Sequence, residues 1–299
     1  MEILVANNQL KNLGGSETFT YTLAKELRRQ GHEVDVFTNV PGLVSSKLEH
    51  EKFKVFTEAN QTKYDLVLAS HKTCVEKLSH LGYTIQTVHG TTPKLEQPNL
   101  KANYFVAISE EIKEHLKTKH NLESQVILNG IDCERFKPTR PINQQLKKVL
   151  SLSQSDELNQ KLKKLFNDKG IEFTSLNKFA NPVWNVEDYI NDADLVVSLG
   201  RGAYEAMACS RLVFVWDHRR YQLEIGDGIV TLGNIDQLLR TNCSGRYYHY
   251  TDLDYKINEV IDNYILFSTL QSHMRWYSEQ SLNIQKQAKK YLETYEREK

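Results

Sequence analysis

Short apolar runs alternate with segments of helical periodicity, and this alternation constrains the fold more than any other feature of the sequence. An apolar run at residues 3–6 precedes a segment, residues 16–30, in which Phe19, Leu23 and Leu27 recur every four positions. Further strand-like runs lie at residues 34–37, 66–69, 84–88, 104–108, 126–128, 148–152, 171–176, 195–199 and 212–216. Strands that alternate with helices predict an α/β protein in which helices cover both faces of parallel sheets.

The alternation is interrupted once, at residues 136–141, where two prolines break both periodicities. A chain of 299 residues also exceeds the usual size of one domain. We therefore expect two Rossmann-like domains, one at residues 1–138 and the other at residues 139–274. Residues 255–270 and 274–295 are predicted to be the last helices, because the strand pattern stops before them.

Composition and charge exclude several classes of function. Lysine plus arginine and aspartate plus glutamate both number 38, so no net basic charge attracts nucleic acid. The four cysteines lie far apart without metal-site spacing, which favours reduced thiols. No stretch approaches the ~18 apolar residues of a membrane span, and the first residues resemble a strand rather than a signal peptide. We expect a soluble, cytoplasmic protein with no nucleic-acid partner and no transmembrane segment, while contact with a membrane surface stays open.

The loop between the first strand and the first helix contains Gly14 and Gly15. Glycines let the backbone approach a ligand closely, and Ser16 is suited to cap a helix whose first N–H groups face an anion. The loop matches neither the GxGxxG nor the Walker pattern, which disfavours a dinucleotide or ATP site. Taken alone, such a Gly-Gly turn is more often only a tight connection.

Several short motifs occur in a fixed order along the chain. They are Gly14-Gly15-Ser16-Glu17, Gly31-His32-Glu33-Val34, Tyr64-Asp65-Leu66-Val67, Thr87-Val88-His89-Gly90, Ala107-Ile108-Ser109-Glu110-Glu111, Asn129-Gly130-Ile131-Asp132 followed by Arg135-Phe136 and Pro138, and Glu205-Ala206-Met207-Ala208-Cys209. The ordered set resembles the retaining GT-B glycosyltransferases of family four, also called group 1. The resemblance covers roughly residues 2–138 well and about 185–230 moderately.

The resemblance implies a GT-B architecture, with two Rossmann-like domains whose parallel sheets face a central cleft. It places the acceptor on the first domain and the nucleotide-sugar donor on the second. It also implies that the last helix, about residues 275–299, packs onto the first domain through Trp276, Ile284 and Ala288, with Tyr291 and Tyr295 beyond them. The implied reaction is transfer of a sugar from a UDP- or GDP-sugar to a glycan, glycolipid or other hydroxyl acceptor, without a metal ion or a cofactor.

Three departures from the family pattern leave other functions open. The usual basic residues at the start of the second domain are missing from residues 149–155, and Val197 stands where the family tends to have a second glutamate. The second domain is short, and Ser210 replaces a glycine. One alternative is a catalytically weak nucleotide-sugar-binding protein or partner subunit. Another is a GT-B sugar-nucleotide epimerase, since a fold alone does not fix a reaction.

The predicted donor site lies where a strand ends near Leu199 and a helix begins. By resemblance, Glu205 binds the donor ribose, a role that suits a carboxylate. The other interpretation is an acidic residue at the helix N-terminus that the dipole favours. As a ribose-binding residue Glu205 is expected to be exposed in the first turn, so that its truncation leaves the fold intact. The loop and first turn, Gly200, Arg201, Gly202 and Ala203, are predicted to hold the diphosphate through backbone N–H groups and the guanidinium. Arg201 is otherwise a solvated surface residue.

Two further residues are assigned by resemblance. His89 follows a strand, and its imidazole is expected to face the donor sugar and phosphate as the catalytic residue. The alternative is a turn histidine satisfied by backbone groups. Glu224 matches a donor-binding segment of the family but is equally consistent with a structural role. Gly14 and Gly15 complete the predicted donor-binding set.

No metal site is predicted from the sequence. Asp252 and Asp254 form a DxD string, the kind of pattern that binds a metal-nucleotide complex. They stand at the beginning of a predicted late helix, where capping of the helix explains an aspartate better.

Overall fold

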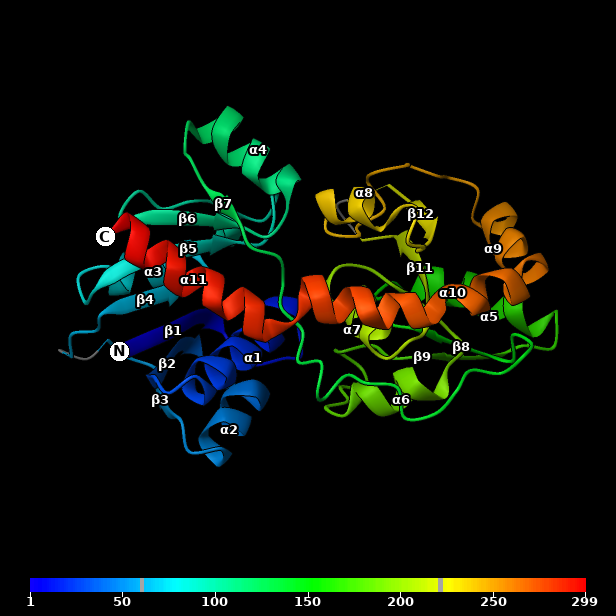
Figure 1. The fold of residues 1–299 in the computed structure, drawn as a ribbon, viewed down its shortest axis with the longest axis horizontal. Helices are drawn as coiled ribbons and strands as arrows, with labels where there is room; N and C mark the ends of the chain where they lie inside the picture. Colours follow the sequence, from blue (N-terminus) through cyan, green and yellow to red (C-terminus); the bar gives the residue numbers. More distant parts are fainter. Residues whose placement is uncertain (60–61, 220–222) are drawn as a thin grey trace. The chain divides into compact units, whose positions relative to one another are not determined.

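The computed structural model describes residues 1–59, 62–219 and 223–299, and its chain divides into two compact units (Figure 1). The first unit combines Met1–Gly130 with Ile284–Lys299, and the second consists of Ile131–Asn283. Within the described residues, the structure contains no helix with the length and apolar character that crossing a bilayer requires.

The first unit contains a seven-stranded sheet in which every neighbouring pair is parallel. In spatial order its strands are β3 (Lys54–Phe56), β2 (Glu33–Val40), β1 (Glu2–Gln9), β4 (Leu66–Ala69), β5 (Tyr83–Val88), β6 (Tyr104–Ala107) and β7 (Gln125–Val126). Its helices are α1 (Gly15–Arg29), α2 (Leu43–His50), α3 (Lys72–Leu78), the short 3-10 helix η1 (Lys94–Glu96), α4 (Glu110–His120) and α11 (Ile284–Glu298). The direction of strand addition reverses at β1 and β4, which is where α/β sheets commonly bind ligands.

The second unit contains a five-stranded sheet that is only partly parallel. In spatial order its strands are β12 (Ile225–Ile229), β11 (Leu212–Asp217), β10 (Leu195–Ser198), β8 (Lys148–Ser151) and β9 (Glu172–Ser175). Its helices are α5 (Asp156–Asn167), α6 (Val186–Asp192), α7 (Arg201–Ala208), α8 (Ile235–Arg240), α9 (Leu253–Asp262), α10 (Tyr264–Tyr277) and the π-helical turn η2 (Ser278–Leu282). β12 runs antiparallel to β11, so the expectation of parallel pairing fails at this edge. Only residues 218–224 join the two strands, too few for the crossover that parallel strands need.

The division between the units lies at Gly130, whereas the sequence analysis placed it at Pro138. The segment after Gly130 is held within the second unit by the guanidinium of Arg275. This group donates hydrogen bonds to the carbonyl oxygens of Cys133 and Phe136, and also to that of Ala208 at the end of α7. The prolines therefore follow the domain boundary and do not form it.

The predicted helix at residues 274–295 is divided in the structure. Residues up to Tyr277 belong to α10 of the second unit, the chain passes through η2, and α11 begins at Ile284. Trp276, which was expected to pack against the first domain, lies on α10 with 57% of its surface exposed. The face that α11 buries consists of Ile284, Gln287, Ala288, Tyr291, Thr294 and Tyr295.

α11 completes the first unit through specific contacts with the sheet. The hydroxyl of Tyr291 lies 2.9 Å from that of Thr87 on β5, and both groups are buried. The ring of Tyr295 packs edge-on against that of Tyr83 at a centroid distance of 5.5 Å. Because Tyr83 and Thr87 lie at the two ends of β5, the helix runs along the length of this strand.

Two helix caps expected from the sequence are present. Ser109 accepts a hydrogen bond from the N–H of Ile112 at the beginning of α4. Asp252 accepts one from the N–H of Tyr255 at the beginning of α9, which is the capping role preferred for the DxD string. Ser16 does not cap α1, because the helix begins at Gly15 and its cap residue is Gly14.

The close approach of α11 to the end of the first unit depends on Gly130. A Cβ atom added there would lie 2.5 Å from Cδ1 and 2.8 Å from Cα of Ile284. We expect Gly130→Ala to lower the free energy of unfolding by about 1–3 kcal/mol, the usual cost of overpacking. Urea denaturation measures this, with Gly233→Ala as the control, because a Cβ there meets only Thr231 Oγ1 at 3.7 Å. Equal stability of both variants would contradict the packing.

Candidate functional site

The carboxyl ends of β1, β4 and β5 lie side by side, and polar residues lie at or just after each of them. His71 comes after β4, is 4% exposed and accepts a hydrogen bond at Nδ1 from the backbone N–H of Asn8 at 3.2 Å. Since Nδ1 is the acceptor, the proton of the neutral imidazole is on Nε2. This Nε2 lies 3.4 Å from Oε1 of Glu96 in η1.

Glu96 connects His71 to the residue predicted to be catalytic. Its Oε2 accepts a hydrogen bond of 3.0 Å from the backbone N–H of His89, which follows β5. Burial raises the pKa of Glu96, but hydrogen bonds from the His71 ring and the His89 backbone, together with the electrostatic influence of both imidazoles, lower it below the ordinary value. The carboxylate is therefore ionised at neutral pH.

The ring of His89 is half-buried between two neighbours. Its Nε2 lies 3.3 Å from Oγ of Ser70, the residue that follows β4, and its edge packs against the ring of Phe19 at a centroid distance of 5.2 Å. The structure thus places His89 at the strand end where the sequence analysis expected it. Sequence reasoning missed Ser70, His71 and Glu96; the nearest signal is that Ser70 and His71 directly follow a predicted strand.

The loop at Gly14 and Gly15 has a different environment from the one expected. The carboxylate of Glu17, a residue 4% exposed, folds back over this loop and accepts hydrogen bonds from Ser16 Oγ and Gln9 Nε2. A Cβ on Gly14 would lie 2.2 Å from Oε2 of Glu17. Gly14 therefore makes room for a carboxylate of the protein itself at the beginning of α1, the place predicted for a donor anion.

The beginning of α7 in the second unit follows β10 through a strained turn. Gly200 has a positive φ of 55°, and its N–H donates to the carbonyl oxygen of Cys243. A side chain there would be strained and would approach the amide of Asn242, 3.3 Å from an added Cβ. The N–H of Ala203 already donates to Gly200 O, so it is engaged within the helix and not open to a diphosphate as predicted. Gly202 is half-buried in the first turn.

Arg201 and Glu205 are both buried and form an ion pair with each other. Nε of Arg201 lies 3.0 Å from Oε1 of Glu205, and the two residues are 6% and 8% exposed. Burial raises the pKa of Glu205 and lowers that of Arg201, because it disfavours the charged form of each. The expectation of an exposed first-turn Glu205 is wrong, and so is the alternative interpretation of Arg201 as a solvated surface residue. The α7 helix is packed on all sides, a property that its motif does not reveal.

Glu224 is also paired within the protein. Its Oε2 accepts a hydrogen bond of 2.6 Å from Nζ of Lys161 on α5, and Oε1 accepts one from Nε1 of Trp216. Ligand atoms of Glu157, His218 and Glu224 lie within 4.8 Å of one another, a grouping that the sequence analysis did not predict. Lys161 also contacts Glu157 at 3.3 Å, so its ammonium group lies against both carboxylates.

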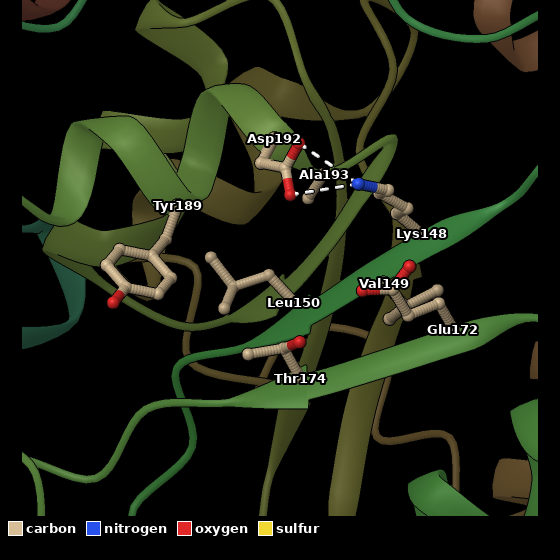
Figure 2. A pocket seen from close by; sticks show the side chains of 8 residues that line it. All are labelled: Lys148, Val149, Leu150, Glu172, Thr174, Tyr189, Asp192 and Ala193. Carbon is tan, nitrogen blue, oxygen red and sulfur yellow. Dashed lines mark hydrogen bonds and ion pairs between the residues drawn. The ribbon is translucent and has the colours of Figure 1, made fainter.

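A surface hollow of the second unit lies apart from these groups. Figure 2 shows Lys148 bonded to both oxygens of Asp192 beside this hollow, with Tyr189 at the opposite side. Its lining consists of Lys148, Val149, Leu150, Glu172, Thr174, Tyr189, Asp192 and Ala193, none of which was predicted as a site residue. Lys148 and Glu172 begin β8 and β9, so the hollow extends over the amino ends of these strands. Because ligands of parallel sheets bind at the carboxyl ends of the strands, this hollow does not have the position expected of a donor site.

No family model matches the sequence, and no curated protein matches it in sequence. Solved structures do match in fold over nearly the whole chain. Anabaena HepE in complex with UDP is 15% identical with a TM-score of 0.69, covering 99% of this chain and 100% of that protein. A glycosyltransferase from Rickettsia africae is 16% identical with a TM-score of 0.68, covering 99% of this chain and 98% of that one.

A third structure, an alpha-glucosyltransferase in complex with UDP and a 13-mer DNA, is 10% identical. Its TM-score is 0.63, and the match covers 99% of both chains. At these identities the likeness concerns the fold alone. The chain thus has the α/β fold of GT-B glycosyltransferases across both of its units.

Proposed function

We propose that the protein is a retaining glycosyltransferase that transfers a sugar from a UDP- or GDP-sugar to a hydroxyl group of a glycan or glycolipid. The observation that carries this proposal is the agreement in fold with glycosyltransferases over 98–100% of their chains. HepE, one of these structures, was solved with UDP and with UDP-glucose. A nucleotide-sugar donor is therefore the first substrate to test.

In this proposal His89 acts on the donor from the first unit. Its imidazole stands at the carboxyl end of β5, next to the point where the sheet reverses its order, and is partly exposed. An imidazole so placed can hydrogen-bond the transferring sugar or stabilise the negative charge that develops on the leaving diphosphate. The ordered contacts with Ser70 and Glu96 support a fixed orientation.

The beginning of α7 holds the diphosphate in the same proposal. The N–H of Gly202 and the positive end of the helix dipole favour an anion there. Arg201 contributes positive charge, and Glu205 contacts the ribose. In the reaction, a bond forms between the acceptor oxygen and the sugar carbon C1 while the bond from C1 to the diphosphate oxygen breaks. The acceptor proton passes to the departing diphosphate on the same face. The protein therefore orients the two substrates and stabilises the charge on the diphosphate, and it supplies no base.

The internal pairing of the predicted donor contacts favours a second candidate, a catalytically weak nucleotide-sugar-binding protein. Arg201 and Glu205 form a buried ion pair, and Glu224 is paired with Lys161. A donor would have to compete with these contacts. Turnover of a labelled nucleotide sugar separates the two candidates, since binding without transfer or hydrolysis supports the second.

We expect a UDP- or GDP-sugar to raise the melting temperature, whereas ADP- and CMP-sugars do not. A ligand present at 100 times its Kd stabilises the native state by about 2.7 kcal/mol, which a thermal-shift assay detects.

His89→Ala is expected to keep this shift in melting temperature and to slow sugar transfer by about 10²-fold, the lower range for loss of one transition-state donor. If no nucleotide sugar alters the melting temperature, the donor proposal is wrong.

Glu205→Ala is expected to lower the free energy of unfolding by about 3–5 kcal/mol, because it leaves Arg201 buried without its carboxylate partner. The matched variant removes both charges, as Arg201→Met with Glu205→Leu, and should recover most of that loss. Urea denaturation measures both effects.

The double variant also tests the donor role. It should bind the preferred nucleotide sugar one to two orders of magnitude more weakly, since charged hydrogen bonds to ligand contribute about 1.5–3 kcal/mol. Calorimetric titration with unchanged affinity in the folded double variant would remove this pair from the donor site.

A further inference from the structure

We propose that Glu96 is a positioning residue for His89, and that His71 fixes Glu96 in this role. The inference rests on the proposed function, in which His89 acts on the donor. It adds two residues that the family motifs do not contain and that do not themselves touch the substrate.

The two hydrogen-bond donors that face the side chain of residue 96 require a carboxylate at this position. Oε2 faces the backbone N–H of His89 at 3.0 Å, and Oε1 faces Nε2 of His71 at 3.4 Å. The N–H of Asn8 occupies Nδ1 of His71, so the proton of this imidazole is on Nε2. Both neighbours of Glu96 are therefore donors. A carboxylate accepts from both, whereas an amide would direct its own N–H group at one of them.

The same contacts link three neighbouring strand ends. Asn8 lies near the end of β1, His71 after β4 and His89 after β5, and Glu96 binds the last two from η1. The chain between His89 and Glu96 is consequently closed into a loop by the side chain of Glu96. With the backbone of His89 held, its ring is restricted between Ser70 Oγ and the ring of Phe19.

Glu96 influences His89 through its charge as well as through its hydrogen bond. The side chain of Glu96 is only 12% exposed, and burial alone would raise its pKa; the titratable groups that act on it, His71 and His89, lower this pKa instead. Coupling between two sites is reciprocal. The ionised Glu96 is therefore expected to favour the protonated form of His89 in turn. A protonated imidazole is the form that best stabilises a departing diphosphate.

The test is an NMR titration of the His89 imidazole, assigned with His89→Ala, in the full chain without substrate. In Glu96→Gln the midpoint of the ring should lie at lower pH than in wild type, because the negative charge that favours the protonated imidazole has been removed. Glu96→Asp keeps the charge and both acceptor oxygens and should move the midpoint less. Glu123→Gln, which replaces a carboxylate with 77% of its side chain exposed, should leave the midpoint unchanged.

The free energy of unfolding gives a second readout, which requires neither NMR assignments nor an activity assay. A group with a lowered folded pKa stabilises the protein above its unfolded pKa and loses this contribution as pH falls through the folded value. Wild type should thus exceed Glu96→Gln in unfolding free energy near pH 7, and the difference should shrink below about pH 4.5. If Glu96→Gln is too unstable for the NMR titration, its unfolding free energy is measured against pH in the presence of a nucleotide or an osmolyte that stabilises the folded state.

An unchanged His89 midpoint in folded Glu96→Gln, or a stability difference independent of pH, would overturn the proposal. In transfer assays a positioning role predicts a lower kcat with little change in KM for the donor, and partial rescue in Glu96→Asp. The titration uses neither donor nor acceptor. A shifted midpoint in a protein that transfers no sugar would therefore reject the proposed function and leave the role of Glu96 intact.

Discussion

The parallel pairing of β1 with both β2 and β4 is the constraint on which the first unit depends. A chain that adds strands first on one side of β1 and then on the other leaves the carboxyl end of β1 without a connection crossing over it. The residues that follow β4 and β5 are then brought to one edge although they are distant in sequence. His71 and His89 meet Glu96 there for this reason, and no local motif is needed to assemble them.

The two candidate regions, around Glu96 in the first unit and at the beginning of α7 in the second, differ in how they hold buried charge. In the first unit a carboxylate is held among hydrogen-bond donors and keeps its charge, and one neighbour, His89, remains partly exposed. In the second unit Arg201 and Glu205 neutralise each other below the surface, and burial disfavours the charged form of both. Buried pairs of this kind contribute little net stability, yet neither member can be removed alone without cost. The first region thus holds an ionised carboxylate beside a partly exposed imidazole, whereas the second holds a buried ion pair.

The sequence was sufficient for most strands because their short apolar runs alternate regularly with segments of helical periodicity. It missed β3, which has three residues, and β12, whose sequence Ile225 to Ile229 contains two glycines and has weak strand character. Gly226 is needed there since a Cβ would lie 2.0 Å from the Trp216 ring. Site chemistry was less predictable. His89 followed a strand and could be found, but the partners of Glu96, the fold-back of Glu17 over Gly14 and the burial of Glu205 arise from tertiary contacts that no spacing encodes.

The return of α11 to the first unit has a consequence for how the chain acquires its structure during synthesis. Residues 1–130 leave the ribosome first, but the helix that covers Thr87 and Tyr83 on β5 is made only after the whole second unit. The second unit is continuous in sequence and can form as soon as its own residues have emerged, in keeping with the tendency of domains to fold as units. The first unit is thus completed only after the second unit has been synthesised, and until then the side of β5 that carries Tyr83 and Thr87 lacks the helix that covers it.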